Sequence, residues 1–468
     1  MMRNEHGKSM LRPYQGRFLA NFFASSGLVA HILKASSGLG IHTTVAHLVC
    51  ELLEREPDSR VLIIVPRIGI QHQMHSLLNR LGVHSTAVDR YKFRELQKDS
   101  DGSIWSKGSA YILSVQFALK PDVLESITAT EWNGFVMLDA QAAAQSRMPL
   151  LLGLFKNSRD ARALFTLDPA DELDLSAFFE ANVKVTEWRR SEVLPLVNQG
   201  QTLSIFLEVF KFEYAVDEAL LLEALRQISL VLPQSEVERR AYKIRFLQRA
   251  MSSPLAIEQE LRKLRNEIVH GINVDNFSKH FEPTQENLGD VDCDSSARLM
   301  AFVPAIENVV NELSCLRIDS KLRALLEMLH DSEQPSNAKM WLCIISDYRA
   351  TVFYLEAQLN ELWHSVYTVH GGMPSFDRQQ TVLQFRKSGG ILIVTRSALT
   401  EGLSFPEVGT VIFYDLPGSP KTFDNVLGRF CTYGRLEPLT VKLLGSQLEL
   451  DERTIESFER TVHRFGEQ

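Results

Sequence analysis

The chain has few cysteines and no long apolar segment. Its five cysteines are scattered over 468 residues without a C-x-x-C pair, which argues against a zinc site or a disulfide framework. No apolar run reaches the roughly 18 residues needed to span a bilayer. The opening residues, 1–15, lack the apolar core of a secretion signal. We therefore expect a cytoplasmic protein with no metal site and no membrane partner.

An excess of positive charge is also missing. The net charge is −8, with 23% charged and 45% hydrophobic residues, which is typical of a soluble globular protein. Proteins that coat nucleic acid non-specifically are usually basic, so this charge counts against that role. A local basic groove is still compatible with it. The length predicts two or three domains, each large enough for a hydrophobic core.

Short β-rich apolar runs alternate with amphipathic stretches in two parts of the chain. The strand candidates are residues 61–65, 110–115, 135–138 and 163–166 in the first part, and 341–345, 366–369, 391–394 and 411–414 in the second. Such alternation is typical of a doubly wound parallel sheet. We therefore predict an α/β protein with two parallel-sheet lobes.

The residue pattern changes between the two α/β regions. Residues 216–269 have helical periodicity, and the stretch that follows is polar and acidic. We expect a first lobe at 1–195, a helical insert with an acidic linker at 196–300, and a second lobe at 301–468. In the insert, Arg239, Arg240 and Lys243 alternate with aromatic residues. They form either a nucleic-acid or partner surface, or the solvated face of an amphipathic helix.

An ordered series of motifs runs through both lobes. The first lobe contains LRPYQ, ILKASSGLGIHTT, VLIIVPRIGIQHQ, YILSVQFAL, GFVMLDAQA and ALFTLDPA; the second contains DSKLRALLEML, WLCIISDYRATVFYLEAQL, TVHGGMPSFDRQQ and ILIVTRSALTEGLSFPEV through GRFCTYGR. Their order and spacing resemble those of superfamily-two helicases and translocases of the Swi/Snf type. The resemblance covers roughly residues 10–190 and 315–435. It implies two RecA-like lobes that form a helicase core.

The resemblance implies a phosphate-binding loop at the start of the first lobe. Gly38 and Gly40 fit its frame, because glycines expose backbone N–H groups at a helix N-terminus, where anions are favoured. In the family a lysine follows and reaches the phosphates, and a Ser or Thr holds Mg²⁺. Here Ile41 stands at the lysine position and His42 at the hydroxyl position. The loop is therefore predicted to lack its cation.

The acidic motif also lacks polar residues that the family has. Asp139 remains, but Ala140 replaces the glutamate that positions the attacking water, and Ala142 replaces the coupling histidine. In the last motif Arg429 remains and Thr432 replaces the second arginine. Loss of one charge-stabilising group costs about a hundred- to a thousandfold in rate, and an arginine finger about a thousandfold or more. The sequence therefore predicts a pseudo-ATPase.

The nucleotide and strand contacts follow from the motif positions. No cofactor is expected to be required; weak binding of ATP and Mg²⁺ is left open by five retained residues, Gln15, Gly38, Gly40, Asp139 and Arg429. The resemblance implies phosphate-backbone contacts at Arg67, Gln116, Arg349 and Thr395. The alternative for Thr395 is a helix cap.

Two functions are compatible with these observations. In the first, the chain is a catalytically inactive, helicase-like subunit that binds DNA, partner proteins or both in a larger complex. A defence complex against phage is suggested by family analogy alone. In the second, the chain is an active but divergent ATP-dependent DNA translocase or helicase. Ile41, Ala140 and Thr432 favour the first function.

Overall fold

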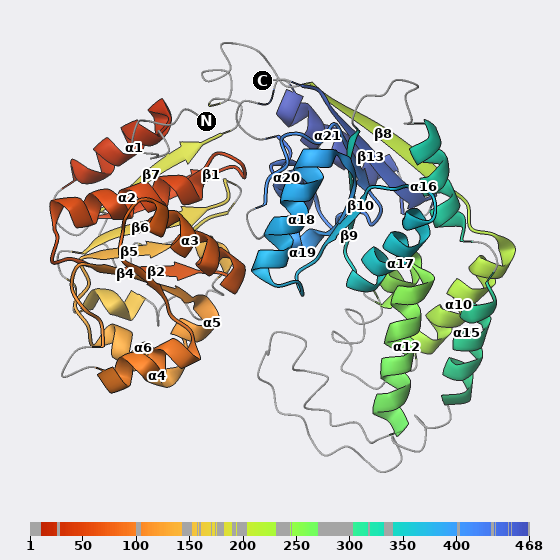
Figure 1. The fold of residues 1–468 in the computed structure, drawn as a ribbon, viewed down its shortest axis with the longest axis horizontal. Coiled ribbons are helices and arrows are strands. Elements are labelled where there is room, and N and C mark those ends of the chain that lie inside the picture. Colours follow the sequence, from red (N-terminus) through yellow and green to blue (C-terminus); the bar gives the residue numbers. More distant parts are fainter. Residues whose placement is uncertain are drawn as a thin grey trace.

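A computed structural model describes most of the chain. The described residues are 11–25, 29–99, 104–142, 152–156, 158, 161–169, 171–173, 175, 182–189, 193, 204–230, 244, 246–269, 303–316, 319–331, 340–399, 403–431, 435, 437–447, 449–450 and 452–466. Figure 1 shows two β-sheets, each covered by helices, and a group of long helices beside the second sheet.

The first sheet has seven parallel strands. Its order is β3 (Ser85–Ala87), β4 (Ser109–Ser114), β2 (Arg60–Val65), β5 (Gly134–Met137), β6 (Arg162–Leu167), β1 (Ala30–Ala35) and β7 (Val183–Trp188). The central strands are buried runs of apolar residues, because helices cover both faces of the sheet. All strands point the same way, so their carboxyl ends meet at one edge.

Helices cover this sheet with two separate apolar cores. One core involves α1 (Pro13–Phe23), α2 (Ile41–Arg55) and α3 (Ile68–Arg80). The other involves α4 (Arg90–Asp99), α5 (Val115–Ala118), α6 (Pro121–Thr128) and the short 3-10 helices η1 (Ala140–Ala142) and η2 (Gly153–Lys156). The segment QHQMHSLLNRLG, residues 71–82, has the pattern of a helix that ends at Gly82, and α3 covers it up to Arg80.

The second sheet has six parallel strands. Its order is β10 (Val366–Val369), β11 (Gly390–Thr395), β9 (Trp341–Ser346), β12 (Thr410–Phe413), β13 (Leu439–Ser446) and β8 (Ile205–Phe212). The helices of this lobe are α16 (Ser320–Asp331), α17 (Arg349–Asn360), α18 (Ser375–Ser388), α19 (Arg396–Leu399), α20 (Pro420–Leu427) and α21 (Glu452–Gly466). Both faces of the sheet carry apolar cores.

The insert is built from helices after the first strand of the second lobe. Residues 246–252 are helical and join α10 (Val216–Leu230), α12 (Pro254–Val269) and α15 (Val303–Cys315) in one apolar cluster. The boundaries differ from the expected 196–300. Strand β8 lies within that range but pairs with β13, and α15 lies beyond it but packs on α12. This edge strand is not a continuous buried apolar run, because three of its eight residues are exposed.

All eight predicted strands are present, and the predicted fold class is confirmed. The chain has two parallel-sheet α/β lobes with a helical insert between parts of them. None of the described helices is long and apolar enough to cross a membrane.

Candidate nucleotide cleft and strand-binding edge

The phosphate-binding loop keeps its backbone frame. It connects β1 to α2, with Gly38 at φ +90° and Gly40 at φ +78°, both in the left-handed region. Gly40 is the residue that precedes α2, and its carbonyl accepts a hydrogen bond of 3.0 Å from Thr44 Oγ1. Since α2 begins at Ile41, the N-terminus of the helix lies where the resemblance places the phosphates.

The two replaced residues of the loop offer neither a cation nor a hydroxyl. Ile41 is half-buried and packs against the core under α1 to α3. Burial and, to a smaller extent, the nearby Arg429 lower the pKa of His42 to about 4, and a hydrogen bond with Gln73 partly opposes this decrease. His42 is therefore a neutral imidazole at pH 7. The residues present do not fit a catalytic Mg²⁺–ATP site.

Gln15, which the resemblance assigned to adenine, stabilises the loop in this structure. It is 2% exposed. Its amide nitrogen donates to the carbonyls of Leu39 and Gly40, at 3.3 and 3.2 Å, and its oxygen accepts from the backbone N–H of Arg12 at 3.0 Å. Tyr14 Oη also donates to the carbonyl of Leu39, at 2.7 Å. The side-chain amide is thus already bonded to the chain itself.

The acidic motif lies at the end of β5 in an unusual conformation. Asp139 has φ +47°, and its backbone N–H donates to Thr166 Oγ1 at 2.9 Å. A non-glycine residue in this region is uncommon and marks local strain. Ala140 follows as the first residue of η1 and is fully buried in the apolar core of the first lobe. The position of the family's glutamate is therefore part of the core.

Charges from both lobes surround Asp139. Burial raises the pKa of its carboxyl, and the neighbouring Asp168 raises it too, while Arg429, Arg67 and Lys421 oppose the shift. Burial lowers the pKa of Arg429, and Asp139 counteracts this. The Nε of Arg429 is shielded from solvent and has no hydrogen-bond partner among the described residues. Asp139 of the first lobe and Arg429 of the second, which both match the motifs of the resemblance, thus attract each other.

The lobes touch at the phosphate-binding loop. A Cβ added to Gly38 would lie 2.7 Å from the carbonyl oxygen of Gly428, which follows α20. Ser37 Oγ donates to the carbonyl of Asn425 at 3.5 Å. Lys421 Nζ forms an ion pair with Asp171 at 2.6 Å. Backbone from the second lobe therefore packs directly on the loop of the first lobe.

Four predicted strand-binding residues lie at the carboxyl edges of the sheets. Arg67 follows β2 and Gln116 follows β4, and these strands are neighbours. Arg349 follows β9 and Thr395 ends β11, which are also neighbours. Arg67, Gln116 and Arg349 are exposed, whereas Thr395 is 3% exposed. The structure therefore gathers the residues of each lobe, but Thr395 offers little surface.

A buried polar cluster in the second lobe was not among the predicted sites. The carboxylate of Asp415, just after β12, accepts hydrogen bonds from Ser252 Oγ at 2.8 Å, Ser346 Oγ at 2.6 Å and the backbone N–H of Asp347 at 2.9 Å. Lys321 Nζ forms an ion pair with it at 3.1 Å. Ser252 belongs to the insert, so this Asp415 cluster joins the insert to the second lobe.

An ion pair adjoins the Asp415 cluster. Arg396 Nη2 donates to Asp347 Oδ2 at 2.6 Å. Burial raises the pKa of Asp347 to about 7, and Arg396 opposes this increase. In the sequence the two residues lie in the segments SDYR and VTRS, each at the end of a predicted strand. Its pairing depends on strand order, which the sequence does not contain.

Some predicted residues cannot be placed. Arg239, Arg240, Lys243 and Thr432 lie outside the described residues, and only the backbone of Ala142 is described, in η1. Among the described residues, no group of three or more His, Cys, Asp and Glu side chains could hold a metal ion.

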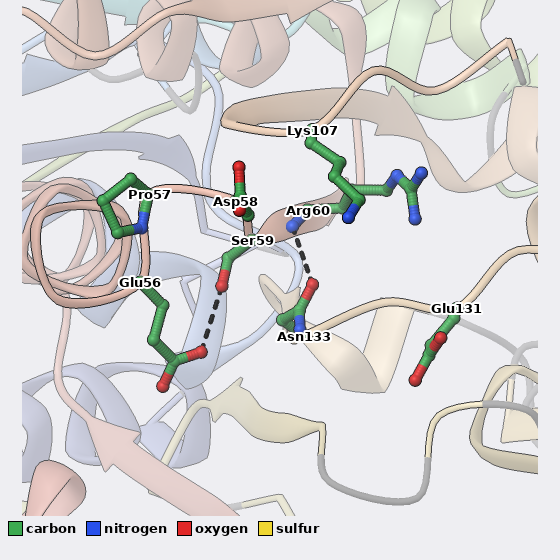
Figure 2. Close-up of a pocket in the computed structure, with 8 residues that line it drawn as sticks. All are labelled: Glu56, Pro57, Asp58, Ser59, Arg60, Lys107, Glu131 and Asn133. Carbon is green, nitrogen blue, oxygen red and sulfur yellow. Dashed lines mark hydrogen bonds between the residues drawn. The ribbon is translucent and has the colours of Figure 1, made fainter.

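A polar pocket lies at the opposite end of the first sheet, where β2, β4 and β5 begin. Figure 2 shows the residues that line it, Glu56, Pro57, Asp58, Ser59, Arg60, Lys107, Glu131 and Asn133. Ser59 Oγ donates to Glu56 Oε2 at 3.0 Å, and the N–H of Arg60 donates to Asn133 Oδ1 at 2.9 Å. These bonds fasten the turn to the sheet. No sequence motif of the resemblance falls here.

Comparison with known proteins supports the helicase assignment of the second lobe. Residues 320–434 match the model of the helicase conserved C-terminal domain. The chain is 26% identical over 168 residues to the ATP-dependent RNA helicase dbp8 of Aspergillus oryzae, covering 36% of each chain. It is 31% identical over 112 residues to dbp8 of Neosartorya fischeri, covering 24% of this chain and 21% of the relative. The matches thus span about a third or less of these relatives.

Solved structures resemble the whole chain. The helicase domain of Pyrococcus furiosus Hef has a TM-score of 0.54 at 14% identity, covering 96% of this chain and 98% of that one. S. cerevisiae Dbp5 bound to RNA and ADP BeF3 has a TM-score of 0.50 at 13% identity, covering 97% and 88%. At these identities the likeness concerns the fold. Residues 320–434 thus match a helicase C-terminal domain, and the whole chain shares the two-lobed, RecA-like fold of these helicase structures. The curated relatives are named RNA helicases, and none of these findings supports the Swi/Snf type over other branches.

Proposed function

We propose that this chain is a helicase-type protein that binds a nucleic-acid strand without hydrolysing ATP. The observation that carries the proposal is the first-lobe edge of the cleft. Ile41 and Ala140 stand at the lysine and glutamate positions, and both pack into apolar cores. Hydrolysis needs charge at these positions to stabilise the transition state. Loss of both leaves little plausible turnover, even allowing for non-additivity.

The contact between the lobes supports the same proposal. Gly428 packs on Gly38, and Lys421 pairs with Asp171. In a motor, bound nucleotide supplies the differential contacts that close the lobes. Here contacts of the chain itself connect them. Such contacts favour stable binding of a strand over repeated opening and closing of the two lobes.

The strand is the second part of the proposal. Arg67, Gln116 and Arg349 lie exposed at the two carboxyl edges, where backbone phosphates can be bound without sequence preference. The names of the relatives make RNA a ligand to test beside the DNA that we first expected. A larger complex, including one that acts against phage, stays an analogy.

The direct test is ATP turnover by the purified chain, with and without single-stranded RNA, single-stranded DNA and duplex DNA. We expect the rate of a blank in every case. The Asp139→Ala variant serves as the matched control, because it removes the last acidic group of the family site. Strand-stimulated turnover of about one per second that Asp139→Ala abolishes would show an active, divergent translocase instead.

A further inference from the structure

We propose that the second lobe stacks unpaired nucleobases on the Arg349–Phe353 pair, so that the strand it binds is single-stranded. The inference rests on the proposed strand-binding function and names its ligand more closely. It is independent of whether ATP is hydrolysed.

The pair lies on the first turns of α17. Arg349 and Phe353 are four residues apart, so their side chains share one face of the helix. The guanidinium carbon of Arg349 lies 5.1 Å from the centroid of the Phe353 ring, within range of a cation–π contact. Arg349 is exposed, and Phe353 is 37% exposed. The surface therefore presents an ordered guanidinium on an aromatic ring to solvent.

Two neighbouring residues fix the geometry of the pair. The ring of His370 meets Phe353 edge-on, with centroids 5.1 Å apart and planes at 78°. A Cβ on Gly372 would lie 2.7 Å from Arg349 Nη1 and 3.4 Å from His370 Nδ1. The missing side chain at Gly372 thus makes room for the guanidinium. Pre-ordering of this kind lowers the entropy that binding must lose.

The surroundings are positive. Burial lowers the pKa of His370, and the neighbouring Arg349 and Arg378 lower it too, so two guanidinium groups lie beside this ring. His370 Nδ1 is shielded and has no hydrogen-bond partner among the described residues. A second phenylalanine, Phe376, is 69% exposed on the first turn of α18, two residues before Arg378. Cationic and aromatic side chains together suit a strand with phosphates and bare bases.

The chemistry distinguishes single strands from duplexes. In a duplex the base faces are covered by their neighbours, so a side chain at the surface reaches only backbone and groove edges. In a single strand every base has a free face that can stack on an aromatic ring or a guanidinium plane. An exposed aromatic–guanidinium pair therefore suits unpaired bases better than the stacked bases of a duplex.

The test measures binding of oligo(dT), oligo(U) and a DNA duplex, with 2-aminopurine in each single strand to report stacking. We expect Phe353→Leu to weaken single-strand binding about tenfold and to reverse part of the 2-aminopurine signal. Duplex binding and the slope of log K against log salt should not change. Arg349→Gln should reduce that slope on single strands by about 0.7. The two oligonucleotides separate a DNA ligand from an RNA ligand.

Two controls keep the result interpretable. Tyr91→Leu removes an aromatic ring that is 78% exposed on α4 of the first lobe, and it should change nothing. Phe376→Leu alters an exposed ring that holds no core, so a stacking effect there cannot come from misfolding. Single-strand binding that Phe353→Leu leaves unchanged would overturn the inference, whatever the effect of Phe376→Leu, and would leave the proposed function intact. Absence of binding to any strand would overturn both.

Discussion

The carboxyl edges of the two sheets have the same architecture and opposite character. At the first edge, the positions for catalytic charge carry Ile41 and Ala140, which belong to apolar cores. At the second, Asp415 and Lys321 are buried but fully engaged with polar partners. The second edge lies within residues 320–434, which match the helicase conserved C-terminal domain. The two corresponding edges thus differ in packing: apolar core residues occupy the compared positions of the first lobe, and a buried polar cluster occupies those of the second.

The largest effect should come from the buried ion pair of the second lobe. Lys321 and Asp415 have side chains that are 4% and 8% exposed. Removing one partner leaves a buried charge uncompensated, which costs about 3–5 kcal/mol. We expect Lys321→Met to lower the free energy of unfolding by that amount in urea titrations. Lys421→Met, in the more exposed pair with Asp171, should cost about 1 kcal/mol or less. Equal effects would mean that burial does not determine how much each ion pair contributes to the free energy of unfolding.

The next effect concerns the first lobe. Ala140→Glu places a carboxylate at a fully buried position, and we expect it to lower the free energy of unfolding by about 2–3 kcal/mol without restoring turnover. The neighbouring Gln141 is exposed, so Gln141→Glu should stay within about 0.5 kcal/mol. A stable, ATP-hydrolysing Ala140→Glu variant would show that the position faces the cleft.

A substitution at the contact between the lobes should have a smaller effect on stability and should move the lobes apart. Gly38→Ala meets the Gly428 carbonyl at 2.7 Å and adds strain of about 1–2 kcal/mol at a left-handed residue. We expect small-angle scattering to show a larger radius of gyration. Gly82→Ala is the matched control, because Gly82 has a similar φ of +78° and nothing within 4 Å of its added Cβ. A radius unchanged by Gly38→Ala but changed by Gly82→Ala would contradict the interlobe contact.

Measured per pH unit, the smallest effect on the free energy of unfolding is the response to pH. This response should have opposite signs in the two lobes. His42 has a folded pKa of about 4, below its unfolded value of 6.5, so its contribution is lost as pH falls between these values. Asp347 has a folded pKa of about 7, above its unfolded value of 3.8, so stability is lost as pH rises through this window.

Each group can change the unfolding free energy by at most about 1.4 kcal/mol per pH unit. Urea titrations from pH 4 to 7 compare each variant with the wild type. His42→Asn should abolish the decrease in unfolding free energy at low pH, and Asp347→Asn should abolish the decrease at high pH. The same sign for both variants would refute this assignment.

The sequence predicted both lobes because central parallel strands are continuous apolar runs with few alternatives. It also predicted Asp139 and Arg429 at the cleft, since motif order places them at strand and helix ends. It did not predict the Asp415 cluster, because Ser252, Lys321 and Ser346 meet only through tertiary structure. Gln15 carried a motif role, but its bonds to Leu39 and Gly40 depend on how α1 packs on the loop.

Strand β8 was missed for a different reason. Its side chains alternate between partly exposed and exposed, and it lies far in sequence from its partner β13. Edge strands with solvated faces resemble loops in a single sequence. The position of the insert, after β8, therefore had to come from the structure.

Strand affinity measured with and without Mg²⁺–ATP tests the central claim most directly. If contacts of the chain itself hold the lobes and the cleft lacks its catalytic charges, the Kd for a single strand should be the same within twofold in both conditions. Turnover should stay at the level of a blank throughout. A tenfold change in Kd that requires ATP, accompanied by hydrolysis, would contradict the account.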